Sequence, residues 1–163
     1  MAMTSYMMVT GRSQGEMKGD CTQEGEQRKD KILVYDISHT IEIPRDRLTG
    51  LPTGQRIHMP LTVTKHFDKS SPLLYQALCS GEQCDVELYF FRITEKGTEE
   101  HYFTVKLMNA IVVELQAYKP MVFLPENKPY HDMEKVSFTY SKIIWTYVVD
   151  GIESEDDWQK PKA

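Results

Sequence analysis

The chain has 163 residues and a formal net charge of −5, with an isoelectric point near 5.5. An acidic balance argues against a nucleic-acid partner, because contacts with phosphate need a basic face. The longest apolar runs, such as Ile111-Val112-Val113, are far too short to span a membrane, so we expect no membrane insertion.

The length predicts one domain, which we place at residues 1–158, followed by a short C-terminal tail at 159–163. The first residues, MAMTSY, lack the basic and apolar regions of a secretory signal peptide. Cys21, Cys79 and Cys84 are an odd number of cysteines, and their spacing fits no common zinc motif. We favour structural thiols over a Cys79–Cys84 bridge.

The first element is a short strand at 5–10. The polar, glycine-bearing segment 11–31 then predicts a long surface loop.

Residues 31–43 show the clearest alternation of the chain and predict a strand with one face in the core. The inward face would carry Leu33, Tyr35, Ile37, His39, Ile41 and Ile43. The outward face would carry Asp36, Ser38, Thr40 and Glu42. We expect His39 to be a buried, hydrogen-bonded histidine rather than a metal ligand.

A turn-rich insertion at 44–54 separates this strand from the next, because its prolines and glycines disfavour regular structure. Alternation resumes at 56–66, with Ile57, Met59, Leu61 and Val63 predicted inward and His58, Thr62, Thr64 and His66 outward. Pro60 cannot donate to a ladder, so this strand should lie at an edge or be bulged there.

Residues 72–80 carry the one full set of helix signals in the chain. Ser70 or Ser71 could cap the first turn, Pro72 suits the first helical position, and Gly81 can end the helix. Leu73, Leu74, Ala77 and Leu78 form an apolar stripe. So short a helix must pack on something, and the rest of the chain predicts strands, so we expect a β-barrel or sandwich.

The second half of the chain continues as strands. Residues 85–94 are apolar on both faces and pair through a turn at 95–98 with 101–108, and 111–118 continues in the same way. A proline-bearing loop at 119–132 exposes Met121-Val122-Phe123-Leu124. The last strand region, 134–149, changes phase near Ser141, which suggests a bulge. The acidic run 150–157 predicts a solvated or interface-facing tail rather than a calcium site.

Motifs for chemistry are missing from the sequence. There is no H-x-H or H-E-x-x-H pair, no G-x-S-x-G, no Walker loop and no G-x-G-x-x-G. We therefore expect no enzymatic activity, no metal and no cofactor.

Several segments in order resemble the haemolysin-coregulated proteins (Hcp), the tail-tube subunits of bacterial type VI secretion systems. The segment that carries most of the resemblance is Lys65-His66-Phe67-Asp68-Lys69-Ser70-Ser71-Pro72-x-Leu74, with Cys79-Ser80-Gly81 at the end of the predicted helix. Leu107-Met108-Asn109-Ala110 and the late strand from Glu134 to Ile143 follow in family order. The early loop at 12–29 and the insertion at 44–55 depart from the family pattern.

The resemblance implies a mainly β protein, an antiparallel β-barrel of two packed sheets with one short flanking helix at about 72–80. It implies a hexameric ring, rings that stack into a tube, and expulsion of that tube by a contractile sheath. The partners would be the sheath, the tip spike and baseplate proteins, and small effectors in the lumen. The protein would lie in the bacterial cytoplasm before firing and then leave the cell without a signal peptide.

Three sets of residues are candidates for these roles. The polar face Asp36, Ser38, Thr40 and Glu42 would line the lumen. The doubly apolar strands would supply the subunit interface through Tyr89, Phe91, Ile93, Trp145 and Tyr147, since one copy alone would not cover them. The insertion would make the ring-stacking contact through Arg45, Arg47, Leu48 and Leu51.

Two alternatives come from other classes. One is a monomeric β-sandwich that binds a small molecule or carbohydrate on Trp145, Trp158 and Tyr147. The other is a hydrolase with a Cys/His pair. Native mass separates the ring from both.

Overall fold

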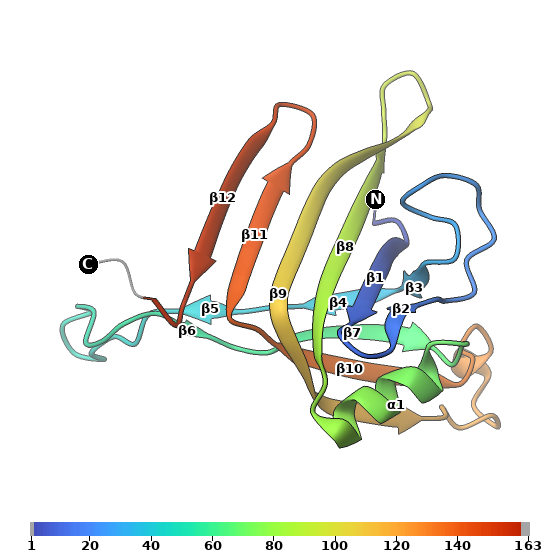
Figure 1. Ribbon diagram of the computed structural model, residues 1–163, viewed down its shortest axis with the longest axis horizontal. Coiled ribbons are helices and arrows are strands. Elements are labelled where there is room, and N and C mark those ends of the chain that lie inside the picture. The colour runs from blue at the N-terminus through green and yellow to red at the C-terminus, as the bar shows by residue number, and fades with distance from the viewer. Residues whose placement is uncertain (1, 161–163) are drawn as a thin grey trace.

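The computed structural model describes residues 2–160, and its regular structure is almost all antiparallel strand, with one α-helix packed beside the strands (Figure 1). The first strands are β1 (Ser5–Gly11), β2 (Gly15–Met17), β3 (Ile32–Val34), β4 (Asp36–Ser38), β5 (Ile41–Glu42), β6 (Ile57–His58) and β7 (Leu61–His66). The helix α1 (Ser71–Ser80) follows. The remaining strands are β8 (Gln83–Ile93), β9 (Glu99–Tyr118), β10 (Met133–Thr139), β11 (Lys142–Tyr147) and β12 (Ile152–Asp157), with a short 3-10 helix η1 (Pro125–Asn127) before β10.

The strand pairings form a closed circuit. β1 pairs with β8, β8 with β9, β9 with β10, and β10 with β7. The segment 32–38 completes the circuit, because β3 pairs with β1 while β4 pairs with β7. Between them the Tyr35 amide donates to the Thr64 carbonyl oxygen at 2.9 Å. The predicted barrel with one flanking helix is thereby confirmed.

The two predicted layers belong to one continuous sheet, because β9 is shared between them. The N-terminal part of β9 pairs with β8 and β11, and residues 111–118 pair with β10. The chain bends near Asn109, whose φ of 53° is left-handed and whose amide bonds the Asp85 carboxylate at 3.2 Å. β11 and β12 extend the sheet beyond the circuit on the far side of β9 (Figure 1).

The core lies inside the circuit and under the helix. Met7, Val63, Leu88, Leu107 and Val136 are fully buried in it, and Leu74 and Ala77 supply the inner side of α1. The predicted stripe is thus confirmed, with Leu73 and Leu78 packed at its borders.

The helix ends as predicted but begins differently. Gly81 adopts a left-handed φ of 68°, and its amide bonds the Leu78 carbonyl oxygen. Ser70 stands at the N-cap position with Pro72 in the first turn, yet neither serine hydroxyl caps a helix amide. Ser70 has helical dihedral angles, which point its side chain away from those amides, and its hydroxyl donates to Asp68 instead.

The strand predicted at 31–43 is wrong in its phase and its continuity. Ile32 and Val34 are buried, whereas Tyr35, Ile41 and Ile43 are exposed. The alternation shifts at Tyr35, where the chain leaves β1 and joins β7, and it fails after β4 because the chain leaves the barrel.

A similar shift occurs around Pro60. Ile57 and Met59 are exposed and His58 is buried, the reverse of the prediction, while Leu61 and Val63 lie inward as expected. Pro60 separates β6 from β7, and β6 pairs only with β5 outside the barrel. The acidic run 150–157 also differs from the predicted tail, because most of it is strand β12 paired with β11.

Candidate functional site

Polar side chains, of which those of Thr64 and Ser137 are themselves buried, cover the outer side of β4, β7, β10 and the end of β9. Ser38, Thr62, Ser137 and Glu114 lie opposite one another in one transverse row. Asp36, Thr64, Lys135 and Gln116 form a second row. Ile37, Val63, Val136 and Leu115 point to the other side of the same strands, into the core. We call the two polar rows the polar face.

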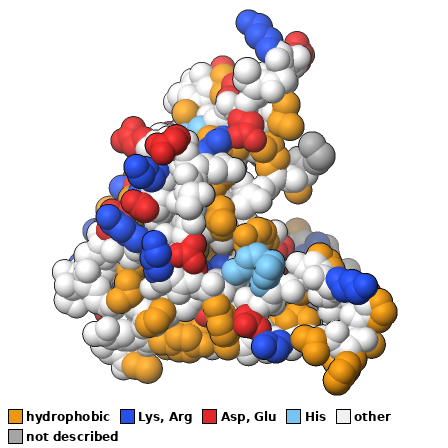
Figure 2. Space-filling model, turned by 90° about the vertical axis from the view of Figure 1, so that its right-hand side faces the viewer, with side chains coloured by type: hydrophobic (Ala, Val, Ile, Leu, Met, Phe, Trp, Pro, Cys, Tyr) orange, Lys and Arg blue, Asp and Glu red, His pale blue; other side chains and the backbone are white. Residues whose placement is uncertain are grey.

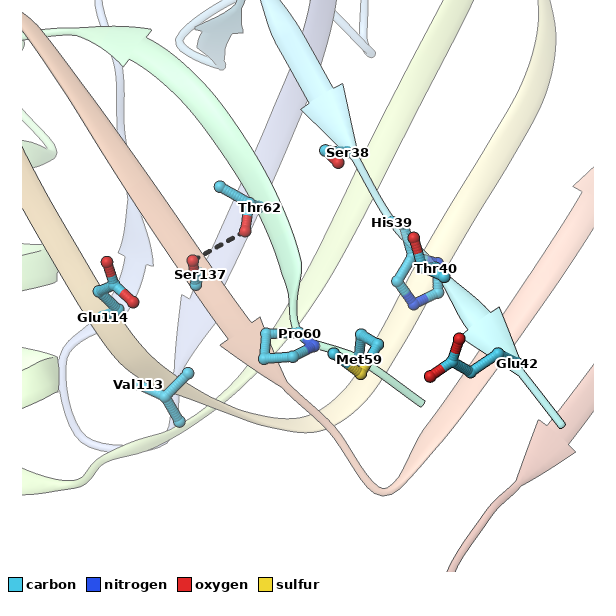
Figure 3. A pocket seen from close by; sticks show the side chains of 10 residues that line it. All are labelled: Ser38, His39, Thr40, Glu42, Met59, Pro60, Thr62, Val113, Glu114 and Ser137. Atoms are coloured by element: carbon cyan, nitrogen blue, oxygen red, sulfur yellow. Dashed lines mark hydrogen bonds between the residues drawn. The ribbon is translucent and has the colours of Figure 1, made fainter. Parts of the chain in front are cut away.

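The polar face deepens at one end into a hollow of about 370 Å³ (Figure 3). Ser38, Thr40 and Glu42 line it from one side, while Val113 and Glu114 line it from β9. Val113 joins Glu114 on this side because β9 bulges there: Ser137 pairs with Glu114, but Phe138 pairs with Val112.

The hollow brings together three of the four residues predicted for a lumen. Asp36 lies farther along the polar face and borders a separate hollow beside Phe90 and Phe91. Within residues 2–160, neither Glu42 nor Glu114 forms an ion pair, although Lys135 is exposed in the neighbouring row. The polar face therefore carries more negative than positive charge.

The predicted insertion is an ordered, protruding finger, which we define as residues 43–56. The Asp46 amide donates to the Leu51 carbonyl oxygen, and the Thr53 amide donates to the Pro44 carbonyl oxygen, at 2.9 and 2.8 Å. Asp46 Oδ1 accepts from the amides of Leu48 and Thr49 at 2.7 and 2.8 Å. These bonds, with that to Thr49 first, lower the pKa of Asp46.

The tip of the finger is among the most exposed apolar parts of the described chain. Leu48 is 97% exposed and Leu51 is 64% exposed, and Arg45 and Arg47 stand beside them. The structure thus brings the four predicted stacking residues onto one projection. Figure 1 shows the finger leaving the barrel at the end opposite to the loop 119–132.

The loop 119–132 is the other large exposed apolar segment. Met121, Val122, Phe123 and Leu124 are all exposed, as predicted, and Phe123 reaches 89%. Figure 2 shows hydrophobic side chains gathered along the lower part of the face turned to the viewer.

Part of the predicted subunit interface is covered by the chain's own early loop. Tyr89 is 9% exposed and packs with Tyr6 and Cys21. The Arg28 guanidinium lies 4.2 Å from the centre of the Phe91 ring. The expectation that only a second copy could cover this face is therefore wrong for Tyr89, and Phe91 is half-buried.

The early loop is held close by its backbone. Gly19 donates to the Asp30 carbonyl oxygen at 2.9 Å, and Cys21 donates to that of Lys31 at 3.2 Å. A Cβ atom at Gly19 would stand 2.5 Å from the Lys31 oxygen, so only glycine fits this approach.

The other interface candidates keep some exposure. Ile93 is 49% exposed near the β8–β9 hairpin turn. Trp145 packs partly against the core. The Tyr147 hydroxyl accepts a hydrogen bond from Arg92 at 3.1 Å, and Arg92 also bonds Glu100 at 2.6 Å.

A stacking platform for a small ligand does not form. Trp158 stacks on His58 at 5.9 Å between ring centres, and its indole N–H donates to the Tyr140 carbonyl oxygen. Trp158 is 37% exposed, but these contacts hold its ring against His58 and Tyr140 of its own chain rather than beside Trp145 and Tyr147.

A cysteine nucleophile also finds no support. Burial, with Glu82 and Asp85 nearby, raises the pKa of Cys84 to about 11, which disfavours the reactive thiolate. All three cysteines are free, and Cys79 is exposed at the end of α1. Among residues 2–160, no three histidine, cysteine or acidic side chains converge to hold a metal.

Sequence reasoning missed a buried ionic cluster beneath α1. Lys65 and Glu134 lie directly opposite on β7 and β10, both without solvent exposure, and form an ion pair. Lys65 Nζ also bonds Asp68 Oδ1 at 3.0 Å and Ser71 Oγ at 3.1 Å. The only signal was the phase of the two charged residues, since Lys65 alternates with the inward Leu61 and Val63 and Glu134 with the inward Val136 and Phe138.

Comparisons with known proteins agree with this architecture. The family model described as "Type VI secretion system effector, Hcp" matches residues 6–147. The "Major exported protein" of Pseudomonas aeruginosa is 42% identical, over all of this chain and 99% of that protein.

Solved structures with the same fold include two from named Hcp proteins. One is a crystal structure of an Hcp protein, with a TM-score of 0.88 and 31% identity over 97% of this chain and 99% of that one. Another is the secreted protein Hcp3 from Pseudomonas aeruginosa, with a TM-score of 0.75 and 36% identity over 94% of this chain and 99% of that one. In the part of the chain that the structure describes, no helix has the length and apolarity to cross a membrane.

Proposed function

This chain belongs to the Hcp family of type VI secretion proteins, and we propose that it is the structural subunit of the tube that such a system expels. Copies would close into a hexameric ring, the number that the family resemblance implies. Rings would stack into a tube, and effectors would travel inside it. The name of the 42% identical relative, "Major exported protein", supports export of this chain as well.

The observation that carries the proposal is the polar face. Four neighbouring strands present hydroxyl, amide and charged groups on one side and core residues on the other. Such a surface suits the wall of a water-filled bore that must hold cargo without burying it permanently. Asp36, Ser38, Thr40 and Glu42 would line this bore, together with Thr62, Glu114 and Lys135.

Stacking of one ring on the next would use the finger. Leu48 and Leu51 would leave water against the next ring, and Arg45 and Arg47 would meet acidic groups there. The loop 119–132 lies at the other end of the subunit (Figure 1) and offers a second apolar surface. Different surfaces at opposite ends make a head-to-tail contact, which repeats without closing and so lengthens a tube.

The side-to-side contact within a ring would use what remains exposed on β8 and β11. The candidates for this contact are Ile93, Phe91, Trp145 and Tyr147. Tyr89 is no longer a candidate, because its own chain buries it. The helix α1 would then lie on the outer wall, where a contractile sheath could contact it. The tip spike and baseplate would meet the end of the stack.

Native mass and electron microscopy of the purified protein test the proposal. We expect a particle of about six times the 18.9 kDa of one chain, and rings that lengthen into tubes at high concentration. A Leu48→Asp, Leu51→Asp variant should still form rings but should lose the tubes, because charged side chains resist burial between rings. Tyr75→Asp on the outer side of α1 is the matched control and should keep both.

A folded chain that stays monomeric at every concentration would refute the ring. Tubes formed by the finger variant as readily as by the wild type would instead refute only the role of the finger.

A further inference from the structure

A buried chain of hydrogen bonds joins the base of the finger to the C-terminal strand, and the proposed function makes no use of it. At its centre is Tyr140, which follows β10 and is 4% exposed. The Tyr140 hydroxyl lies 2.8 Å from His39 Nε2 and 2.7 Å from His58 Nδ1. We call this set the Tyr140 network; it comprises His39, Arg56, His58, Tyr140, Asp156 and Trp158.

The network ends at a carboxylate on β12. Asp156 lies 2.7 Å from His58 Nε2 and accepts two hydrogen bonds from Arg56, at 2.5 and 2.8 Å. Arg56 also donates to the Asp157 carbonyl oxygen at 3.1 Å. Arg56 closes the finger, so these bonds fix one side of the finger to β12.

Water has little access to the centre of the network. The His58 side chain is 1% exposed, and the Trp158 ring stacks on it. His39 stands on the other side of Tyr140, between β4 and β5, and lines the hollow of the polar face (Figure 3). His39 therefore joins the proposed bore to the base of the finger.

The partners of each ring assign its protons when both rings are neutral. Asp156 can only accept, so His58 then donates from Nε2 and has a free electron pair on Nδ1. The Tyr140 hydroxyl donates to that pair, and its oxygen then accepts from His39 Nε2–H. Every group in this arrangement has a partner.

The arrangement tolerates one added proton but not two. A proton on His58 Nδ1 turns the Tyr140 hydroxyl toward His39, which can accept in its other tautomer, and Asp156 balances the charge. When a second proton is added, on His39, both rings are cationic and both donate to the Tyr140 oxygen. The Tyr140 hydroxyl hydrogen then has neither ring as an acceptor.

We propose that the Tyr140 network is a proton-dependent tie, which holds the segment 39–42 and the finger to the barrel at neutral pH and releases them when His39 and His58 are both protonated.

The charges around His39 agree with this. Burial, followed by the neighbouring His58, lowers the pKa of His39, so its neutral form is favoured in the folded protein. Glu42 lines the same hollow but is not paired with His39. Asp156 and Arg56 face His58 from β12 and the finger, and Trp158 covers it.

The consequence for the tube depends on the proposed function. If the finger joins rings, acidification would loosen the ring-to-ring contact and the adjoining edge of the bore together. Asp156 and Arg56 remain paired meanwhile, so β12 should stay attached.

Hydrogen exchange measured by mass spectrometry tests the tie in the subunit itself. Protection of residues 39–56, corrected for intrinsic exchange, should fall by up to about tenfold for each pH unit below the ordinary histidine pKa of about 6.5. His39→Gln keeps a neutral N–H donor toward Tyr140 and should remove this pH dependence. His131→Gln, an exposed histidine outside the network, should leave the wild-type pattern unchanged.

Tyr140→Phe provides a second test, because it removes the shared hydroxyl. We expect weak protection of 39–56 at both pH 7.5 and pH 5. Wild-type protection that does not change with pH, or a His39→Gln profile equal to that of the wild type, would overturn the proposal. Ring and tube formation are followed separately, so tubes with a pH-independent finger would reject the tie and keep the proposed function. Hydrogen exchange of residues 39–56 that depends on pH in a chain that forms no rings would keep the tie and reject the proposed function.

Discussion

At the residue scale, Lys65 and Glu134 explain why the stretch 65–74, which carries the family resemblance, is so rich in polar residues. Lys65 and Ser71 from that stretch both contact Glu134, which accepts from the Ser71 hydroxyl at 2.7 Å, and Asp68 pairs with Lys65. The stretch therefore encodes the attachment of α1 to β7 and β10. The helix hydroxyls serve this attachment rather than the cap.

Replacing Lys65 by methionine should destabilise the protein by about 3–5 kcal/mol, because Glu134 would lose its cationic partner while it stays buried. Urea denaturation at fixed protein concentration measures the change. Lys69→Met is the control: Lys69 lies in the same stretch with a 72% exposed side chain, and its loss should change stability by less than about 0.5 kcal/mol.

Adding Glu134→Leu to Lys65→Met should restore much of the stability, since the fully buried carboxylate is then gone and Asp68 keeps its hydrogen bonds from Ser70. A double variant as unstable as the single one would show that volume, and not charge, decides the cost.

The sequence could predict the helix that covers this cluster but not the cluster itself. The helix, with Pro72 and Gly81, follows from local rules, but Lys65 and Glu134 are far apart in the chain and meet through the register of β7 and β10. Period-two alternation assigns residues to faces, and it does not say which strand lies beside which.

At the scale of elements, a single side chain, that of Asp46, orders the tip of the finger. Asp46 accepts two amide hydrogens that would otherwise face water, and its own backbone closes the ladder with Leu51 and Gly50. Turn residues in the sequence suggested an irregular loop, but the same residues form a hydrogen-bonded projection.

Asp46→Ala should free the tip of the finger without unfolding the barrel. Hydrogen exchange of residues 47–51 should become several-fold faster, while the thermal midpoint stays close to that of the wild type. Asp46→Asn keeps an acceptor oxygen and is the matched control. Slow exchange retained in Asp46→Ala would mean that the backbone bonds alone hold the finger.

Strands whose partners stay the same along their length were predictable. β7 is the example: it keeps β10 beside it along its whole length, and Leu61 and Val63 face the core as the alternation predicts. The segment 32–42 was not predictable, because it changes its pairing strand at Tyr35 and then leaves the barrel. Neither event has a local signal in the sequence. For the same reason the lumen candidates Ser38, Thr40 and Glu42 were found together while the buried side of their strand was assigned wrongly.

At the scale of the whole molecule, the histidines make the fold sensitive to acid. Burial lowers the pKa of His39, His66 and His101, with His131 and Lys65 adding to the effect on His66. An unfolded chain binds these protons more readily than the folded one, so stability must fall once the pH drops below the ordinary histidine pKa of 6.5.

Carboxylates add a second loss at lower pH. Hydrogen bonds from Gln14, then Ser13, lower the pKa of Glu82 from 4.5 to about 2, so its contribution is complete above pH 4.5 and disappears toward pH 2. The denaturation midpoint should therefore be level between pH 7 and 8, decline below 6.5 and decline again below 4.5. A midpoint that is highest at pH 5 would contradict this order.

The border formed by β11 and β12 has a mechanical consequence. β12 has a ladder on one side only, whereas the six segments of the circuit each hold neighbours on both sides. Tension applied at the C-terminal end would peel β12 from β11 one bond pair at a time, but the circuit would have to break many bonds at once. A subunit under load would thus lose its outer hairpin first and keep its wall intact.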